Sequence, residues 1–278
     1  MSRDTLQTRL ADYGQEQVLR YWEELTSDQQ QRLQSQIDDL DLDQLATLIA
    51  GEDEKPDFES LAAAASPPPA VLADGTGADW TDDDATKRGE VALRAGEIGA
   101  VLVAGGQGTR LGFDQPKGMY PIGPVSDRTL FQIFADRLLA IGQHYGVSIP
   151  LYIMTSAATD AETREYFEHN NYLGLNRNDV RIFQQGTMPA VDSQTGKLLL
   201  ASKDSLALSP DGHGGTVRAL DKSGCLDDAH ERGVKHLAYF QVDNPLVALC
   251  DPTLLGHHLL ANSEMTSQVV RKRYATEK

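Results

Sequence analysis

Short apolar runs alternate with longer amphipathic segments from residue 98 onward, and this alternation constrains the fold more than any other feature of the chain. The runs are continuously apolar, which is typical of strands that a parallel sheet buries on both faces. Amphipathic segments between such strands are typical of helices that cover the sheet. We therefore predict an α/β fold with a mostly parallel sheet and helices on both of its faces. The predicted strands are residues 98–104, 149–154, 180–184, 237–242 and 267–270, and the predicted helices are residues 129–145, 160–170, 216–233 and 252–261.

The first 95 residues follow a different pattern. They begin with polar helices that carry a thin apolar stripe, and the second of these is predicted to start at Thr26-Ser27-Asp28 and to run to residue 49. An Ala-, Pro- and Gly-rich stretch predicts a linker, and a short helix over 83–95 leads into the first strand. We expect a helical N-terminal region with its linker over 1–95 and an α/β domain over 96–278. Within that domain, Gln194-Thr195-Gly196 lies between apolar stretches and predicts a hairpin insertion.

Charge and cysteine content exclude several classes of function. The 278 residues carry a formal net charge of −16, which argues against a general affinity for nucleic acid or for an anionic membrane. The two cysteines, Cys225 and Cys250, have no metal-ligand spacing and are expected to be reduced thiols of a cytoplasmic protein. The N-terminal residues lack the apolar region of a signal peptide, and no apolar run approaches the length of a membrane-spanning helix. We expect a cytoplasmic protein without nucleic-acid or membrane partners.

A glycine-rich stretch, VLVAGGQGTRLGFDQPKGMY, directly follows the first predicted strand and is the first candidate site. Its glycine spacing departs from the dinucleotide fingerprint, and its Pro-Lys-Gly departs from a Walker loop. Gly105, Gly106 and Gly108 are predicted to let the backbone approach a ligand and to point N–H groups at an anion. Arg110 and Lys117 add two positive charges suited to phosphate oxygens. In a parallel sheet, ligands bind at the carboxyl ends of the strands, which is where this stretch lies.

The string V-A-G-G-Q-G-T-R-L-G, followed four residues later by P-K-G-M-Y, resembles the nucleotide loop of the eukaryotic-type UDP-sugar pyrophosphorylases, and most closely their UDP-N-acetylhexosamine (N-acetylglucosamine) branch. The resemblance implies a Rossmann-like nucleotidyltransferase fold. It also implies a reaction that uses Mg²⁺ and in which UTP and a sugar 1-phosphate form a UDP-sugar and pyrophosphate. UDP-N-acetylglucosamine is the UDP-sugar that we expect. Further segments resemble the same family in the same order: TLFQIFADRLL, IPLYIMTSAATDAETREYF, FQQGTMPA, SPDGHGGTVRAL and FQVDNPLVALCDP.

The resemblance also implies roles for individual residues. Arg110 and Lys117 match the catalytic positive residues on the triphosphate, and Asp243 matches a carboxylate that holds Mg²⁺. His213 and Asn244 match positions beside the sugar and the nucleotide. The nucleotide-binding positions fall on Val103, Ala104, Gly105, Gly106, Gln107, Gly108, Gln185 and Gly212. The sugar phosphate oxygen is already an anion at neutral pH, so this reaction needs alignment and charge neutralisation rather than a general base.

Two departures from the family pattern leave alternatives open. His213 stands where the N-acetylhexosamine enzymes have Asn and where glucose-specific relatives have His, so a UDP-glucose or broad UDP-sugar pyrophosphorylase is an alternative. The family continues beyond VVRKRYATEK with further strands, sugar-contacting residues and another lysine. We therefore expect the printed chain to preserve nucleotide binding better than turnover, and a catalytically incomplete UTP-binding fragment is the third possibility. A monomer or a weak homo-oligomer is expected.

Overall fold

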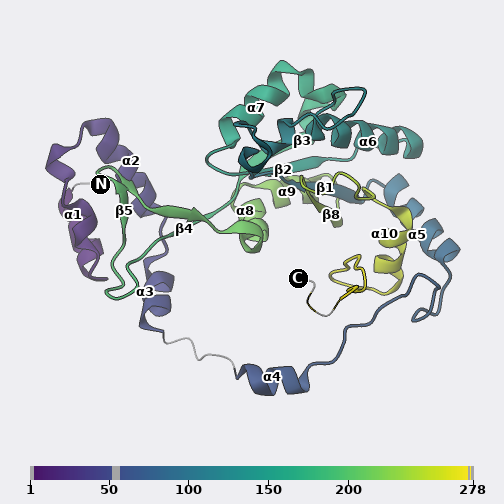
Figure 1. The fold of residues 1–278 in the computed structure, drawn as a ribbon, viewed down its shortest axis with the longest axis horizontal. Coiled ribbons are helices and arrows are strands. Elements are labelled where there is room, and N and C mark those ends of the chain that lie inside the picture. Colours follow the sequence, from purple (N-terminus) through teal and green to yellow (C-terminus); the bar gives the residue numbers. More distant parts are fainter. Residues whose placement is uncertain (1–2, 52–56, 275, 277–278) are drawn as a thin grey trace. The chain divides into compact units, whose positions relative to one another are not determined.

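Four parallel strands form the central sheet of the α/β part of the chain (Figure 1). They are β1 (Ile98–Val103), β2 (Leu151–Thr155), β3 (Val180–Gln184) and β8 (His236–Gln241), and their order across the sheet is β3-β2-β1-β8. All three pairings are parallel, which confirms the predicted α/β class. The chain adds β2 and β3 on one side of β1 and then returns to place β8 on the other side. The topological switch point, where ligands bind in such sheets, therefore lies between β1 and β8.

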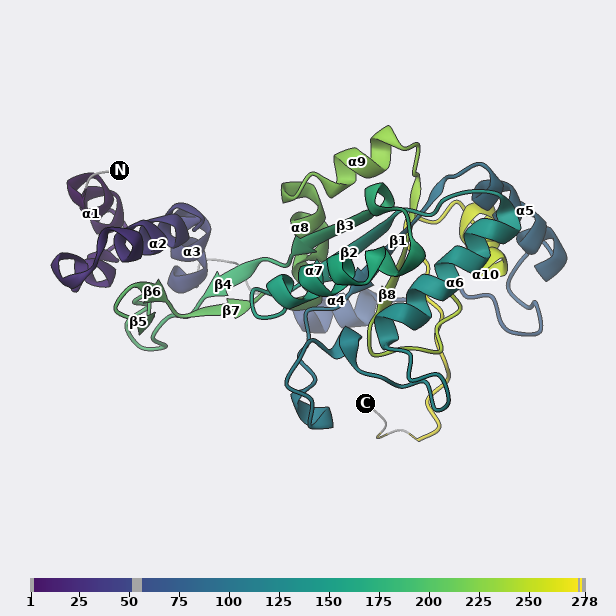
Figure 2. The same cartoon turned by 90° about the horizontal axis from the view of Figure 1, so that it is seen from above.

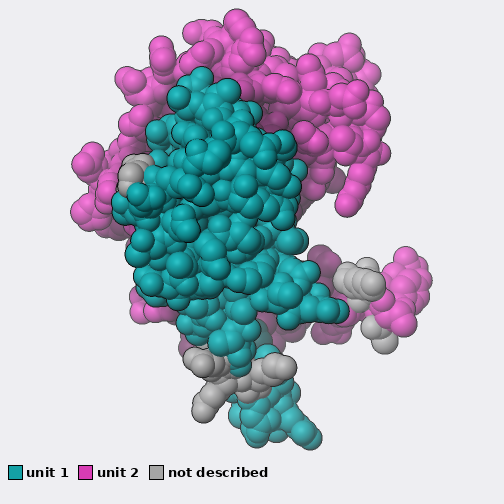
Figure 3. Space-filling view, turned by 90° about the vertical axis from the view of Figure 1, so that its left-hand side faces the viewer, with its two compact units in different colours: residues 1–68, 187–211 teal, residues 69–186, 212–278 magenta. Residues whose placement is uncertain are grey.

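The structure is a computed structural model that describes residues 3–51, 57–274 and 276. The chain divides into two compact units, which are coloured separately in Figure 3. Unit 1 comprises residues 1–68 and 187–211, and unit 2 comprises residues 69–186 and 212–278. This division does not coincide with the expected boundary after residue 95. Residues 69–95 group with the α/β part of the chain, and the hairpin insertion groups with the N-terminal helices.

Helices cover both faces of the sheet, as its apolar strands predict (Figure 2). Side chains such as Leu102 and Ile153 pack on the face that carries α6 and α7, and Val101 and Met154 pack on the face that carries α8 and α9. Alternate residues of a strand point to opposite faces, so β1 contributes to both cores. The helices of unit 2 are α5 (Asp82–Arg94), α6 (Leu130–Tyr145), α7 (Asp160–His169), α8 (Thr216–Lys222), α9 (Cys225–Glu231) and α10 (Pro252–Leu260).

Unit 1 combines the N-terminal helices with the predicted hairpin insertion. Gln15 is buried; its side-chain amide donates to the carbonyl of Gly196 at 3.0 Å and accepts from the N–H of Leu198 at 2.8 Å. The carboxylate of Asp192 caps the predicted turn by accepting from the N–H of Thr195 at 2.8 Å. The elements of this unit are α1 (Arg3–Ala11), α2 (Ser27–Asp38), α3 (Leu42–Ala50), α4 (Phe58–Ala64), β4 (Thr187–Pro189), β5 (Leu200–Ser202), β6 (Ser205–Leu206) and β7 (Leu208–Pro210).

Four predicted segments differ from the structure. Residues 267–270 form no strand, and Val269 and Val270 are exposed, because a strand requires a hydrogen-bonding neighbour and no described strand pairs with this segment. The predicted helix over 216–233 is divided between α8 and α9, since Gly224 adopts a left-handed φ of +73°. The second N-terminal helix begins as predicted, with Thr26 as its cap, but it ends at Asp38 before α3 begins. Part of the predicted linker forms α4, which buries none of its side chains.

None of the helices in the described part of the chain is both long enough and apolar enough to cross a bilayer.

Candidate functional site

The glycine-rich stretch after β1 folds back on itself. The N–H of Gly108 donates to the carbonyl of Gln115 at 3.0 Å, and the N–H of Lys117 donates to the carbonyl of Gly106 at 3.0 Å. These two bonds pair the outgoing and returning chain in antiparallel fashion, with Gln107 opposite Pro116. A Cβ added at Gly106 would lie 3.8 Å from Lys117 Nζ. The loop therefore carries the Lys117 ammonium back to the first glycines of the stretch.

Glycine is required at different positions of this loop for different physical reasons. A Cβ at Gly105 would lie 3.3 Å from Ser156 N and 3.3 Å from Gln185 Oε1, so the bare backbone allows both neighbours to approach. A Cβ at Gly108 would lie 2.7 Å from the ring of Phe113, which means that Gly108 is required for the loop to close on itself. Gly112 takes a left-handed φ of +68° and ends the short 3-10 helix η3 (Thr109–Leu111). Loop closure thus accounts for two glycines, and close approach to neighbouring loops accounts for Gly105.

Lys117 forms an ion pair with Asp243 at the switch point of the sheet. Lys117 Nζ lies 2.8 Å from Asp243 Oδ1. Asp243 lies two residues after the end of β8, and Val242 continues the sheet pairing because its N–H donates to the carbonyl of Val103 at 3.0 Å. The carboxylate is 55% exposed, whereas the lysine side chain is 22% exposed. The pair therefore joins the loops that follow β1 and β8, and it leaves the carboxylate accessible to a ligand.

The loops after β2 and β3 support the first glycine. Ser156, which is buried, donates its hydroxyl hydrogen to the carbonyl of Gly105 at 2.8 Å. The N–H of Gln185 donates to the carbonyl of Thr155 at 2.8 Å, which carries the Gln185 side chain to Gly105. Sequence reasoning placed Gln185 at the nucleotide but did not single out Ser156. The available signal was a small hydroxyl residue directly after a predicted strand.

A buried carboxylate anchors the turn that contains Ser156. Burial raises the pKa of Asp160, but hydrogen bonds from Arg164 and Thr155 outweigh this effect and hold the pKa below its ordinary value. The Thr155 hydroxyl donates to Asp160 Oδ1 at 2.6 Å, and Arg164 Nε donates to Oδ2 at 2.8 Å. Asp160 is therefore charged, and it holds the end of β2 to the start of α7.

The other predicted residues of the glycine stretch and of the segment after β8 differ in their exposure. Val103 and Ala104 are buried, so only their backbone is available to a ligand. Arg110 is exposed, and none of the described residues forms an ion pair with its guanidinium. Gln107 and Asn244 are also exposed.

The Gly-rich turn before α8 contains two further predicted residues. Gly212 takes a φ of +66° and begins the short 3-10 helix η7 (Gly212–Gly215). His213, the next residue, is exposed, and its Nδ1 forms a hydrogen bond with the hydroxyl of Tyr239 on β8. Sequence reasoning identified the histidine but not its tyrosine partner.

Asp243 fits one mode of Mg²⁺ binding. No group of three or more His, Cys, Asp or Glu side chains is arranged to hold a metal within the described ranges. Mg²⁺ is commonly bound through one or two carboxylates, with substrate phosphates and waters as the other ligands. A single half-exposed carboxylate at the switch point fits this mode, in which the nucleotide itself completes the coordination.

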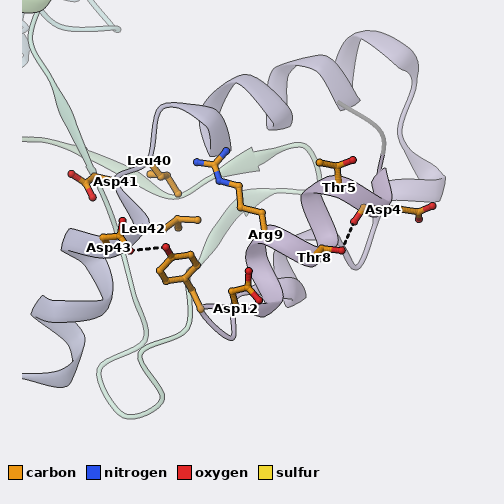
Figure 4. Close-up of a pocket in the computed structure, with 10 residues that line it drawn as sticks. Asp4, Thr5, Thr8, Arg9, Asp12, Leu40, Asp41, Leu42 and Asp43 are labelled. Carbon is orange, nitrogen blue, oxygen red and sulfur yellow. Dashed lines mark hydrogen bonds between the residues drawn. The ribbon is translucent and has the colours of Figure 1, made fainter.

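A separate open pocket of about 750 Å³ lies among the helices of unit 1 (Figure 4). None of the predicted site residues lines it. Arg9 is paired with Asp38 at 2.9 Å, and the hydroxyl of Tyr13 donates to Asp43 at 2.6 Å. The lining also includes Asp4, Asp12 and Asp41. Because these carboxylates would repel a triphosphate, the pocket does not compete with the glycine loop as a nucleotide site.

The chain is similar to known proteins in sequence and in fold. The chain is 38% identical to UDP-N-acetylglucosamine diphosphorylase 2 of Arabidopsis thaliana, over 97% of this chain and 56% of that protein. It is 36% identical to UDP-N-acetylglucosamine pyrophosphorylase of Saccharomyces cerevisiae, over 95% of this chain and 58% of that protein. The crystal structure of the uridine diphosphate N-acetylglucosamine pyrophosphorylase of Trypanosoma brucei matches with a TM-score of 0.77 and 26% identity, over 94% of this chain and 55% of that one.

These matches confirm the predicted fold class. The chain spans a little over half the length of the curated relatives it matches. The family model described as UTP–glucose-1-phosphate uridylyltransferase matches residues 83–278, which include β1, its glycine loop and both partners of the Lys117–Asp243 pair. With that match and with relatives above 30% identity along nearly all of its length, the chain belongs to the UTP–glucose-1-phosphate uridylyltransferase family.

Proposed function

We propose that this chain provides the nucleotide-binding part of a uridylyltransferase that forms UDP-N-acetylglucosamine and pyrophosphate from UTP and N-acetylglucosamine 1-phosphate. The observation that carries the proposal is the Lys117–Asp243 pair, with 2.8 Å between Nζ and Oδ1, at the switch point between β1 and β8. A glycine-rich backbone, a lysine and a carboxylate meet there at the carboxyl ends of parallel strands. This combination suits a nucleoside triphosphate that brings its own metal ion.

The residues have separate tasks in the proposed reaction. The backbone around Gly105 and Gly106 receives the nucleotide, and the Gln185 amide offers a donor and an acceptor to a base edge beside it. Lys117, with the exposed Arg110, neutralises negative charge that grows on the leaving pyrophosphate. The sugar phosphate oxygen attacks as an anion, so the chain needs to align the two substrates rather than to remove a proton.

Asp243 is the residue that would hold Mg²⁺. When bound, the ion would supply charge neutralisation at the phosphates. In the structure the Asp243 carboxylate is paired with Lys117, so the two side chains balance each other's charge. The pair keeps both groups at the sheet edge and limits the side-chain freedom that each of them loses when UTP binds.

The test is the release of pyrophosphate from UTP and Mg²⁺ with a panel of sugar 1-phosphates, together with calorimetric titration of UTP into the same protein. We expect UTP binding, and release that is fastest with N-acetylglucosamine 1-phosphate. Absence of UTP binding would overturn the proposal. Binding without release from any sugar would instead support a UTP-binding fragment.

A second candidate is a UDP-glucose or broad UDP-sugar pyrophosphorylase. His213, where the N-acetylhexosamine enzymes have Asn, favours it. The same panel separates the two, because the second candidate requires glucose 1-phosphate to react at least as fast as the N-acetylated sugar. We further propose that the protein is cytoplasmic and is a monomer or a weak homo-oligomer, which fractionation and sedimentation would test.

A further inference from the structure

The ring of His213 is held by one side chain of the sheet. Its Nδ1 forms a hydrogen bond with the hydroxyl of Tyr239, and the two rings lie with centroids 6.2 Å apart and planes inclined by 69°. The backbone of His213 is held as well, because the hydroxyl of Thr216 donates to its carbonyl at 2.9 Å. His213 is therefore fixed at two points, once through its ring and once through its main chain.

The strand geometry explains why Tyr239 can reach this turn. Phe240, the next residue of β8, is buried on the face that carries α6, where it packs on Phe134 at a centroid distance of 5.1 Å. Tyr239 must then point to the opposite face, which carries α8. The turn that contains His213 immediately precedes α8, so the tyrosine hydroxyl meets the histidine ring there. Tyr239 also lies four residues before Asp243 on the same strand-to-loop segment.

The chemistry of the two groups sets the direction of the hydrogen bond. Burial raises the pKa of Tyr239, so the phenol keeps its proton at neutral pH. A neutral imidazole has one basic nitrogen and one N–H, and the basic nitrogen is a stronger acceptor than a phenol oxygen. The hydroxyl therefore donates to Nδ1, which leaves the ring hydrogen on Nε2.

We infer that Tyr239 is a positioning residue that holds His213 in a single ring orientation with its hydrogen on Nε2, so that this N–H is presented as a donor to a bound UDP-sugar. The inference rests on the proposed function for its ligand, but the tautomer of His213 can be measured without any ligand. Tyr239 acts on the ligand through His213.

The first experiment measures the tautomer by long-range ¹H–¹⁵N correlation spectra of the chain labelled in its histidine rings. The His213 signals are assigned by their loss in His213→Asn. We expect an unprotonated Nδ1 and a protonated Nε2 in the neutral ring, and loss of this single pattern in Tyr239→Phe. The matched control is Tyr166→Phe, which removes a hydroxyl that is 2.8 Å from Thr129 Oγ1, away from His213. A His213 pattern that is unchanged in Tyr239→Phe would overturn the inference.

The second experiment is a double-mutant cycle on the binding of UDP-N-acetylglucosamine and UDP-glucose, measured by calorimetry. We expect Tyr239→Phe to weaken binding about five- to tenfold, in line with the loss of one positioning hydrogen bond. In the His213→Asn background the same change should have less than a twofold effect, because Tyr239 then has no ring to hold. An equal loss in both backgrounds would overturn the inference. If the unsubstituted chain does not bind UTP, the proposed function fails, and the tautomer measurement alone decides the role of Tyr239.

Discussion

The ring of Phe131 occupies the space where Gly118 would carry a side chain. A Cβ added at Gly118 would lie 2.1 Å from Phe131 Cζ. Phe131 is 1% exposed and packs against Phe167 at a centroid distance of 5.1 Å, so its ring has little room to move. Gly118 directly follows Lys117 in the short 3-10 helix η4 (Lys117–Met119). The core beneath α6 thereby sets where the backbone of the lysine lies, which is the physical reason for glycine after the Pro-Lys pair.

The Gly118→Ala variant should therefore be destabilised and should bind UTP more weakly. Overpacking of this kind costs about 1–3 kcal/mol of unfolding free energy. Urea unfolding and UTP calorimetry measure the two effects. The control is the same substitution in a Phe131→Leu background, where the smaller side chain leaves room for the methyl group. If Gly118→Ala costs as much in that background, the ring contact is not the cause.

Removal of the Lys117 ammonium should affect turnover far more than folding. We expect Lys117→Ala to slow pyrophosphate release by about two to three orders of magnitude, as for the loss of one preorganised charge donor. Its unfolding free energy should change by less than about 1 kcal/mol, because ion pairs with an exposed partner contribute little. Lys87→Ala is the matched control, since Lys87 is an exposed lysine paired with Asp83 on α5. Full activity of Lys117→Ala would remove this residue from the proposed mechanism.

Ser156 should support the nucleotide loop without touching the ligand. Ser156→Ala removes the hydrogen bond to the carbonyl of Gly105, and we expect a loss of about 0.5–1.5 kcal/mol in stability together with weaker UTP binding. Ser148→Ala offers a matched comparison, because that hydroxyl bonds Asp179 before β2 begins, at the opposite edge of the sheet. Calorimetry should find UTP affinity reduced only in the first variant. Equal affinities in both would show that the Gly105 contact does not matter for binding.

Asp228 should make the stability of the fold sensitive to acid. Burial raises the pKa of this carboxyl, but hydrogen bonds from Arg181, Arg232 and Tyr152 outweigh the effect and hold it below its ordinary value. A depressed pKa in the folded state gives stability that is present above the ordinary pKa of about 4 and is lost as the pH falls below it.

Unfolding measured from pH 7 down to pH 3 tests this dependence. Asp228→Asn should lower stability at pH 7 and should show a shallower decline in acid than the unsubstituted chain. Asp221→Asn, at an exposed aspartate of α8, should leave both the stability and the slope unchanged. Identical slopes for the Asp228 variant and the unsubstituted chain would contradict the role given to this carboxylate.

The local sequence determined those features whose causes lie within a few residues. The apolar runs of β1 and β2 are recognisable because burial on both faces demands continuous hydrophobic side chains. The start of α6 is marked by Thr129, whose hydroxyl accepts from the N–H of Gln132, as a capping box requires. The glycine and lysine pattern after β1 predicts an anion site at the carboxyl edge of the sheet. That site stays a prediction, and the structure shows that Lys117 and Asp243 meet there.

Only the tertiary structure decided the features whose causes lie far along the chain. Residues 267–270 have the composition of a strand but form none, because pairing depends on a neighbouring strand and not on propensity. The contacts of Ser156 with Gly105, of Phe131 with Gly118 and of Tyr239 with His213 each join segments that are distant in sequence. A sequence can show which residues carry charge or lack a side chain. Which of them meet is set by the order of the strands and by the packing of the helices against them, because that packing fixes where each loop leaves the sheet.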